Sequence, residues 1–302
     1  MIYLELFTIV YFGRLCNKFK VLEYHGAIHI AYILCISTTA FHVIKNIHHN
    51  GYFNNPDQYR DISLFILLIF PFSIEYCIKF KSIIYLFTNI ILTSFIAIST
   101  NSRSCVYLTL ITLIINIKLD FKKSIVAFLG ILVSLMLFIN MVKADDWGHV
   151  KQRFNAGLSS PTRLAENLPD GFHEVSRSKI FINDLQKNIR VNPHNEFLYI
   201  AIYFGKLIGG ILFFTSIIIL ITKILNIWNF FIKKNITNIS VSISFVNLFA
   251  YSMIENYDPY LIFYLTALCF NFKDINDLYN RIKRAARKSV ISIFIYSKNK
   301  NK

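Results

Sequence analysis

Four polar side chains of the sequence have types and positions that suit chemistry on a phosphate-bearing substrate. Arg103 and Arg177 each carry a planar guanidinium that stays charged and can bind two phosphate oxygens at once. His194 can act as a general base while its imidazole is neutral, and Asn195 follows it directly. Because Arg103 and His194 border long apolar segments, the pattern predicts a reaction site at a membrane surface.

The composition indicates the kind of scaffold that must position these residues. The chain has 302 residues, of which 55% are hydrophobic, with 29 Phe and 17 Tyr, and its mean hydropathy is +0.48. Apolar runs recur at about 20 residues each, the length that crosses a bilayer as a helix. We therefore predict an all-α fold, a polytopic transmembrane helical bundle with one long external loop between spans.

The apolar runs divide the chain into four parts. N-terminal transmembrane helices occupy residues 1–142, an external loop 143–193, C-terminal transmembrane helices 194–272 and a basic cytoplasmic tail 273–302. The individual spans are expected at 26–44, 61–78, 83–100, 105–117, 124–142, 196–222, 236–254 and 260–272. Pro71 is expected to kink the second of them. The start of the chain lacks the basic residues and the cleavage site of a signal peptide.

The distribution of charge predicts the orientation of the bundle and excludes one class of partner. The net charge is +15, but the basic residues lie mostly in short loops and the tail, so nucleic acid is not an expected partner. The basic turns that share one side with the tail are 14–20, 79–81, 118–123 and 223–234. This side is predicted to be cytoplasmic. The opposite, external side receives Arg103, the long loop, His194 and Glu255.

The segment after His194 is interpreted as one continuous membrane helix. Asn192 would cap this helix, and Pro193 would take its first position, where a missing N–H costs nothing. The positive end of the helix would keep the His194 imidazole neutral, as a base requires. Small residues would share one face and let another helix approach closely; they are Ala201, Gly205 and Gly209.

The external loop supplies further cations without the pattern of a metal site. Arg177 opens an amphipathic stretch, and Arg190 lies between that stretch and His194. No DxD pattern occurs in the external loops, and the five cysteines lack the spacing of metal ligands. We therefore expect no metal, no cofactor and no disulfide framework, so that arginines would bind the phosphate groups.

Three places in the sequence form a combination typical of one enzyme family. The first is Ser-Thr-Asn-Ser-Arg-Ser at 99–104, and the second is Arg177 ahead of an Ile-Phe pair in a large loop. The third is His-Asn at 194–195 followed by Gly205 and Gly209, with glycine spacing that departs from the family pattern. In these places the chain resembles the O-antigen ligase family of bacterial membrane glycosyltransferases and the related polysaccharide polymerases.

The resemblance implies a reaction and a role for each residue. A glycan on undecaprenyl diphosphate would be transferred to a sugar hydroxyl of lipid A–core at the periplasmic face of the bacterial inner membrane, with inversion and without a metal. Arg103 and Arg177 would stabilise the leaving diphosphate, and His194 would be the catalytic base. Substrate-binding roles would fall to Asn195, Arg190 and Glu255. Membrane lipids are the remaining expected partners.

Other functions stay open at the level of the sequence. An O-antigen polymerase or a protein O-oligosaccharyltransferase would use the same donor with a different acceptor. A transporter or flippase is favoured less, because transport sites lie near the membrane midplane and Glu75 is the one exception among the ionisable groups. The chain is shorter than is usual in the family, so an inactive, truncated member is a further alternative.

Overall fold

The structure is all-α, as the composition predicts. The computed structural model describes residues 8–11, 13–16, 25–46, 56–79, 82–100, 102–117, 120–142, 162–181, 195–233, 239–253, 259–269, 280 and 283. No β-strand occurs within these ranges. The predicted positions of the spans can therefore be compared with helices one by one, except in the tail after residue 269, which lies almost wholly outside the described residues.

The first half of the bundle follows the predicted spans closely. Its helices are α2 (His25–Asn46), α3 (Pro56–Lys79), α4 (Ile83–Ser99), α5 (Arg103–Ile117) and α6 (Phe121–Met141). Local capping sets two of the starts: the Ser82 hydroxyl accepts the Tyr85 N–H at α4, and the Asp120 carboxylate accepts the Lys123 N–H at α6. Hydrogen bonds from the Lys123 side chain and backbone hold the pKa of the exposed Asp120 carboxyl below its usual range.

The second half departs from the prediction at two places. Its helices are α8 (Thr162–Arg177), α9 (Glu196–Phe204), α10 (Lys206–Lys233), α11 (Ile239–Ser252) and α12 (Pro259–Cys269). The continuous helix expected over 196–222 is wrong, because it is interrupted at Gly205 and resumes as α10. The expected basic turn at 223–234 is wrong for Lys223, which is buried inside α10.

Among the described residues, four helices are long and apolar enough to cross a membrane. These segments are Gly26–Lys45, Asp61–Lys79, Phe121–Met141 and Lys206–Ile232. Apolar side chains are exposed along their outer faces; on α10 they include Ile211, Phe214 and Trp228. Exposed apolar surface on helices of this length indicates contact with lipid acyl chains, so the protein is a membrane protein.

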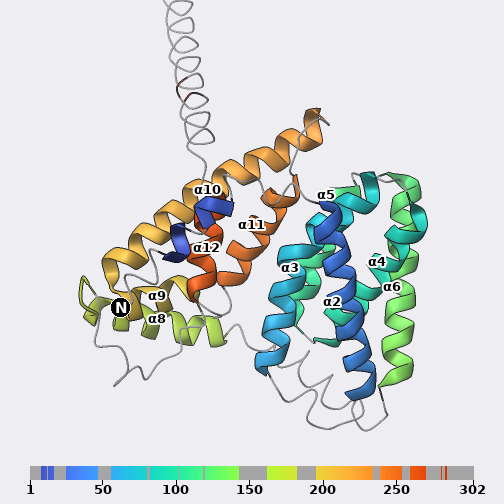
Figure 1. Cartoon of the computed structure of the whole chain (residues 1–302). Helices are drawn as coiled ribbons and strands as arrows, with labels where there is room; N and C mark the ends of the chain where they lie inside the picture. The colour runs from blue at the N-terminus through green and yellow to red at the C-terminus, as the bar shows by residue number, and fades with distance from the viewer. Residues whose placement is uncertain are drawn as a thin grey trace, which may run out of the picture.

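Helix α3 lies at the centre of the bundle. Figure 1 shows α2 and α4–α6 on one side of it and α10–α12 on the other. In its most apolar window 61% of the residues are buried, against 33% or less in the other three candidate spans. Because α3 packs against α2, α4, α5 and α11, its geometry determines how the two groups of helices sit relative to each other.

The contact between α3 and α11 is made by hydrogen bonds around Pro71. Proline has no N–H, so the carbonyl of Leu67, four residues earlier, loses its partner within the helix. Asn247 Nδ2 on α11 donates to that carbonyl (3.3 Å). One turn before Asn247 on α11, Ser244 Oγ donates to Leu68 O (2.7 Å). One turn earlier still, Ser240 Oγ donates to Pro71 O (2.7 Å). A polar stripe on α11 thus supplies the donor that the Leu67 carbonyl lacks and adds bonds to two neighbouring carbonyls of α3.

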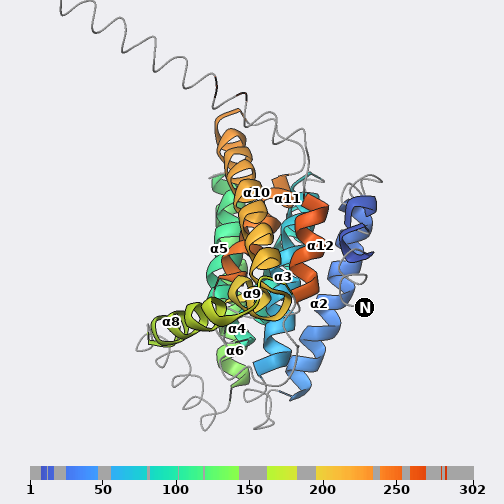
Figure 2. The ribbon, with the colours of Figure 1, turned by 90° about the vertical axis from the view of Figure 1, so that its left-hand side faces the viewer.

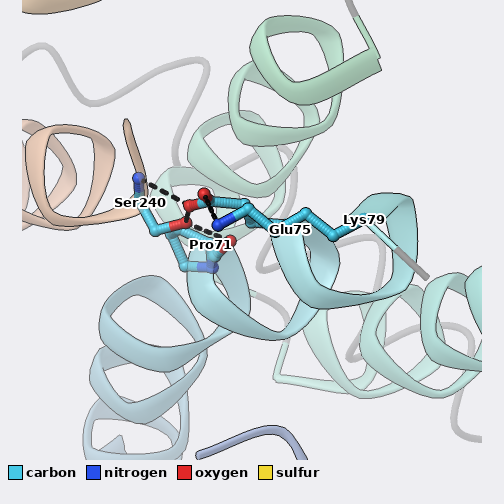
Figure 3. A network of polar contacts seen from close by, with 4 residues as sticks. All are labelled: Pro71, Glu75, Lys79 and Ser240. Atoms are coloured by element: carbon cyan, nitrogen blue, oxygen red, sulfur yellow. Dashed lines mark hydrogen bonds and ion pairs between the residues drawn. The ribbon is translucent and has the colours of Figure 1, made fainter. Parts of the chain in front are cut away.

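The same seam ends at a buried carboxylate (Figure 3). Glu75 Oε2 accepts the backbone N–H of Ser240 (3.2 Å) and contacts its hydroxyl, so the carboxylate of α3 caps the first turn of α11. The other carboxylate oxygen pairs with the half-exposed Lys79 ammonium (2.7 Å). Glu75, which the sequence singled out as the one intramembrane acid, therefore has a structural role in joining two helices.

A second polar network holds α2, α3 and α4 together. His29 Nδ1 lies 2.8 Å from Ser73 Oγ, and Asn89 Nδ2 donates to the same hydroxyl (2.8 Å). Thr93 links Asn89 to the hydroxyl of Tyr32, which is fully buried. Lipid supplies little hydrophobic drive for helix association, so such side-chain bonds and close packing hold membrane helices together.

The α3–α11 seam leads to a double-mutant prediction. Asn247→Ala should lower the free energy of unfolding by about 0.5–1.5 kcal/mol, since it leaves the Leu67 carbonyl without a donor and removes the bond to Thr112 Oγ1 on α5 (2.9 Å). In a Pro71→Ala background the new N–H can bond that carbonyl within α3, so the same change should cost less. Unfolding of the purified protein in mixed micelles measures both values.

A control variant tests whether this coupling is specific. Ser134→Ala removes a hydroxyl that donates from α6 to Ile91 O on α4 (2.9 Å), away from the proline. Its cost should be the same with and without the Pro71→Ala substitution. Equal costs for Asn247→Ala in the two backgrounds would show that Asn247 does not compensate for the proline.

Candidate substrate site at the α9 end of the bundle

Several helices meet at the end of the bundle where α9 lies, which we call the α9 end. Leu108 of α5 packs into a cluster that contains Phe197 and Ile200 of α9, Tyr251 of α11 and residues of α3. At the other end of α5, Ile115 packs against the start of α11, so α5 and α11 are antiparallel. The first residue of α5 and the last residues of α11 therefore lie at the α9 end. Figure 2 shows α8 and α9 side by side at this same end.

Arg103 begins α5 after a turn of only three residues. The Ser102 hydroxyl accepts the Cys105 N–H (3.4 Å), and the Ser102 carbonyl accepts the Val106 N–H, so Ser102 caps the helix. The Arg103 side chain is half-buried. It forms no ion pair or hydrogen bond within the described part of the chain. Arg103 thus presents a cation at the boundary of the bundle, next to the positive end of α5.

Asn195 joins the start of α9 to the end of α11. Its Oδ1 accepts the Leu198 N–H (3.1 Å), which makes Asn195 the N-cap of α9. Its Nδ2 donates to Met253 O (3.3 Å), just past the end of α11. The prediction of Asn192 as the cap is wrong, since the helix begins at Glu196. The Asn195 side chain is buried and both ends of its amide contact protein, so it positions α9 on the bundle.

Gly205 separates α9 from α10. Its φ is +97°, in the region that L-residues with a side chain rarely adopt, and a Cβ there would lie 2.7 Å from the carbonyl oxygens of Ile180 and Phe181. The backbone of the segment after α8 occupies this space and bonds the new helix. Lys206 N–H donates to Lys179 O (3.2 Å), and Leu207 N–H donates to Ile180 O (3.1 Å). These bonds satisfy two of the free N–H groups at the start of α10.

The chain folds back at this break, so that α9 packs on α10. A Cβ added to Gly209 would lie only 2.6 Å from the Cα of Ala201, so the two helices touch here. The rings of Phe197 and Phe213 meet edge to face, with centroids 5.2 Å apart. The predicted close approach at these small residues therefore exists, but it joins two helices of the same hairpin. The prediction that they share one face of a single helix is wrong.

Arg177 and Lys206 add positive charge beside the break. Arg177 is the last residue of α8 and its side chain is exposed. Lys206, the first residue of α10, donates from Nζ to Ser176 O (2.8 Å) and so ties α8 to α10. Together with Arg103, these residues place three cations at the α9 end. Within the described residues, no group of three or more His, Cys, Asp or Glu side chains is arranged to hold a metal ion.

Three predicted site residues lie outside the described residues: His194, Arg190 and Glu255. Their predicted roles as base and substrate-binding groups stay predictions. His194 immediately precedes Asn195 in the sequence, and Glu255 follows Met253 by two positions. The hydrogen bond between Asn195 and Met253 thus joins the two segments of the chain that lead to them.

Two residues at the α9 end were missed by the sequence reasoning. Glu196 is fully buried in the first turn of α9, at the positive end of that helix. Lys206 follows Gly205 directly, inside the apolar run that the sequence predicts as one helix. The signal for both was present: a charged residue inside or beside an apolar run requires either a polar partner or access to water.

Comparisons with known proteins add no assignment. The chain matches no protein-family model, no curated protein and no solved structure.

The break at Gly205 gives a prediction with a matched control. Gly205→Ala should lower the free energy of unfolding by more than about 1 kcal/mol, because of the positive φ and the contact with the backbone of residues 180 and 181. Gly210→Ala should instead leave stability unchanged or raise it by about 0.5–1 kcal/mol, since a Cβ there meets nothing within 4 Å and alanine favours the helix. Thermal unfolding in detergent compares the two variants. Equal stability of both would be incompatible with a chain break at residue 205.

Proposed function

We propose that the chain is a membrane glycosyltransferase of the O-antigen ligase type, which moves a glycan from undecaprenyl diphosphate to a sugar hydroxyl of lipid A–core. One observation carries the proposal. The α9 end brings together the start of α5 with Arg103, the end of α8 with Arg177 and the start of α9 with Asn195. These are the three segments in which the resemblance expects the reacting groups.

The charges at this end suit the leaving group of such a transfer. As the anomeric bond breaks, the undecaprenyl diphosphate gains negative charge, which nearby guanidinium groups stabilise best where water is partly excluded. Arg103 is half-buried and Arg177 is exposed, so we assign the first to the phosphate nearer the bundle. Lys206 holds α8 against α10 and keeps Arg177 at this end. The energy of the reaction comes from the donor ester, so the proposal needs no nucleotide and no metal.

The acceptor needs a group that removes its proton. His194 is the residue we assign to this step, with direct attack of the acceptor oxygen and inversion at the anomeric carbon. In this scheme Asn195 positions the start of α9, because its Oδ1 accepts the Leu198 N–H and its Nδ2 donates to Met253 O. We place the reaction at the periplasmic face of the bacterial inner membrane, with Arg190 and Glu255 as further substrate contacts.

The polymerase and protein O-oligosaccharyltransferase alternatives share this donor chemistry and differ only in the acceptor. The transporter alternative loses its main support. Glu75 was the residue that favoured it, and this carboxylate is bonded to Ser240 and Lys79, where it joins α3 to α11.

The arginines give the first functional prediction. Arg103→Lys and Arg177→Lys keep the positive charge but lose the planar fork, so each should reduce glycan transfer well beyond any change in the amount of folded protein. Lys122→Gln, which removes an exposed charge at the opposite end of the bundle, is the control and should transfer normally. The measurement is capping of lipid A–core per folded molecule. Normal capping by both arginine variants would contradict phosphate binding at the α9 end.

The assignment of His194 as the base gives the second functional prediction. General-base assistance contributes about 10²–10⁴-fold to rate, so His194→Ala should lose that much transfer while the bundle stays folded. His194→Gln keeps hydrogen bonding without basicity and should be almost as slow. Donor binding is measured separately and should be retained. An alanine variant with lower stability but normal activity per folded molecule would make His194 a structural residue.

A further inference from the structure

Three large apolar side chains are exposed close to the cations of the α9 end. Ile180 and Phe181, in the turn that follows α8, are 61% and 62% exposed, and Phe172 on the last turns of α8 is 61% exposed. The turn itself is held firmly, since Lys179 O and Ile180 O accept backbone N–H groups of α10. A fixed backbone that directs apolar side chains outward indicates a surface with a partner.

The exposed side chains continue a surface that faces lipid. Ile180 O is bonded to the N–H of Leu207 (3.1 Å), and Leu207 is the first member of an exposed apolar stripe along α10. The stripe has helical spacing and consists of Leu207, Ile211, Phe214, Ile218, Ile221, Ile224, Trp228 and Ile232. Since α10 is long enough to cross a membrane, the 178–181 turn extends the lipid-facing surface beyond the end of the helix.

Basic residues border this extension. Arg177 and Lys179 are exposed on either side of the buried Ser178, and Lys206 lies next to them on α10. The acidic residues of α8 lie earlier in the helix: Glu174 is about one turn before Arg177, and Asp170 is about two turns before it. Apolar side chains flanked by Lys and Arg form the pattern with which peripheral segments bind anionic lipid interfaces.

We propose that the 178–181 turn, together with Phe172, inserts into the boundary between head groups and acyl chains of an anionic lipid leaflet. Ile180 and Phe181 enter the acyl region beside Leu207, while Arg177 and Lys179 contact the lipid phosphates. The bilayer is the occupant because the surface is continuous with the membrane face of α10. This inference does not depend on glycosyl transfer, although it would hold Arg177 at the level of membrane-bound phosphate groups.

Tryptophan fluorescence in the reconstituted full chain tests the proposal. The background is Trp147→Phe and Trp228→Phe, which removes both native tryptophans, and the probe is Phe181→Trp or, as a second site, Ile180→Trp. Vesicles contain phosphatidylglycerol with acyl chains brominated near the head group. The control is Asp170→Trp, which lies about 200° around α8 from Phe172. Thermal unfolding shows that each variant is folded.

Insertion predicts blue-shifted emission and strong bromolipid quenching for the Phe181→Trp and Ile180→Trp probes, and quenching by aqueous acrylamide for the Asp170→Trp control. Replacing phosphatidylglycerol by phosphatidylcholine should reduce the bromolipid quenching. Acrylamide quenching without bromolipid quenching at residues 180 and 181 would overturn the proposal. Shielding from both quenchers would also overturn it, since a second copy or another protein would then cover the turn. Equal quenching in both lipids would overturn the choice of an anionic leaflet.

Discussion

The arrangement of the whole bundle depends on the hydrogen bonds between α3 and α11 around Pro71, which leaves the Leu67 carbonyl of α3 without its helical partner. A backbone carbonyl without a donor is costly in a membrane, because no water is present to bond it. In this chain Asn247 of α11 donates to that carbonyl, and Ser244 and Ser240 add bonds to the neighbouring Leu68 and Pro71 carbonyls. The requirement aligns α11 on α3 in one register and thereby places the two groups of helices against each other. Arg103 belongs to one group and Asn195 to the other, so the seam determines their relative position.

The second determinant is the choice between a straight helix and a break at Gly205. A straight helix would keep its backbone bonds without external help. The break places a glycine at a φ of +97° and leaves N–H groups of α10 free, and the carbonyls of Lys179 and Ile180 take two of them. In return, Phe197, Ile200 and Phe204 pack against α10–α12. Close packing and hydrogen bonds, rather than removal of apolar surface from water, hold membrane helices together, and the break supplies both.

Sequence reasoning reached the parts of the fold that local composition determines. The spans of α2 to α6 follow from apolar runs bounded by polar turns, and the tight turn before Arg103 follows from residues 99–104. The break at Gly205 was not found, because glycine at helical spacing is equally compatible with a close helix contact. A chain break is favoured over a close helix contact here because the carbonyls of residues 179 and 180 accept the N–H groups that the break frees. These residues lie about 25 positions away in the sequence. Likewise, the cap at Asn195 is stabilised by Met253, a partner that no local pattern indicates.

The α9 end is positioned by several weak bonds rather than by one strong contact. Single interhelical hydrogen bonds in membrane proteins contribute about 0.6 kcal/mol on average, so neither the Asn195–Met253 bond nor the Lys206–Ser176 bond could hold α9 alone. The first ties α9 to α11 and the second ties α8 to α10, while α11 is itself tied to α3. A shift of any one helix therefore changes the geometry at the ends of the others. Because of this coupling, residues far from the α9 end can alter its geometry without contacting the residues of that end.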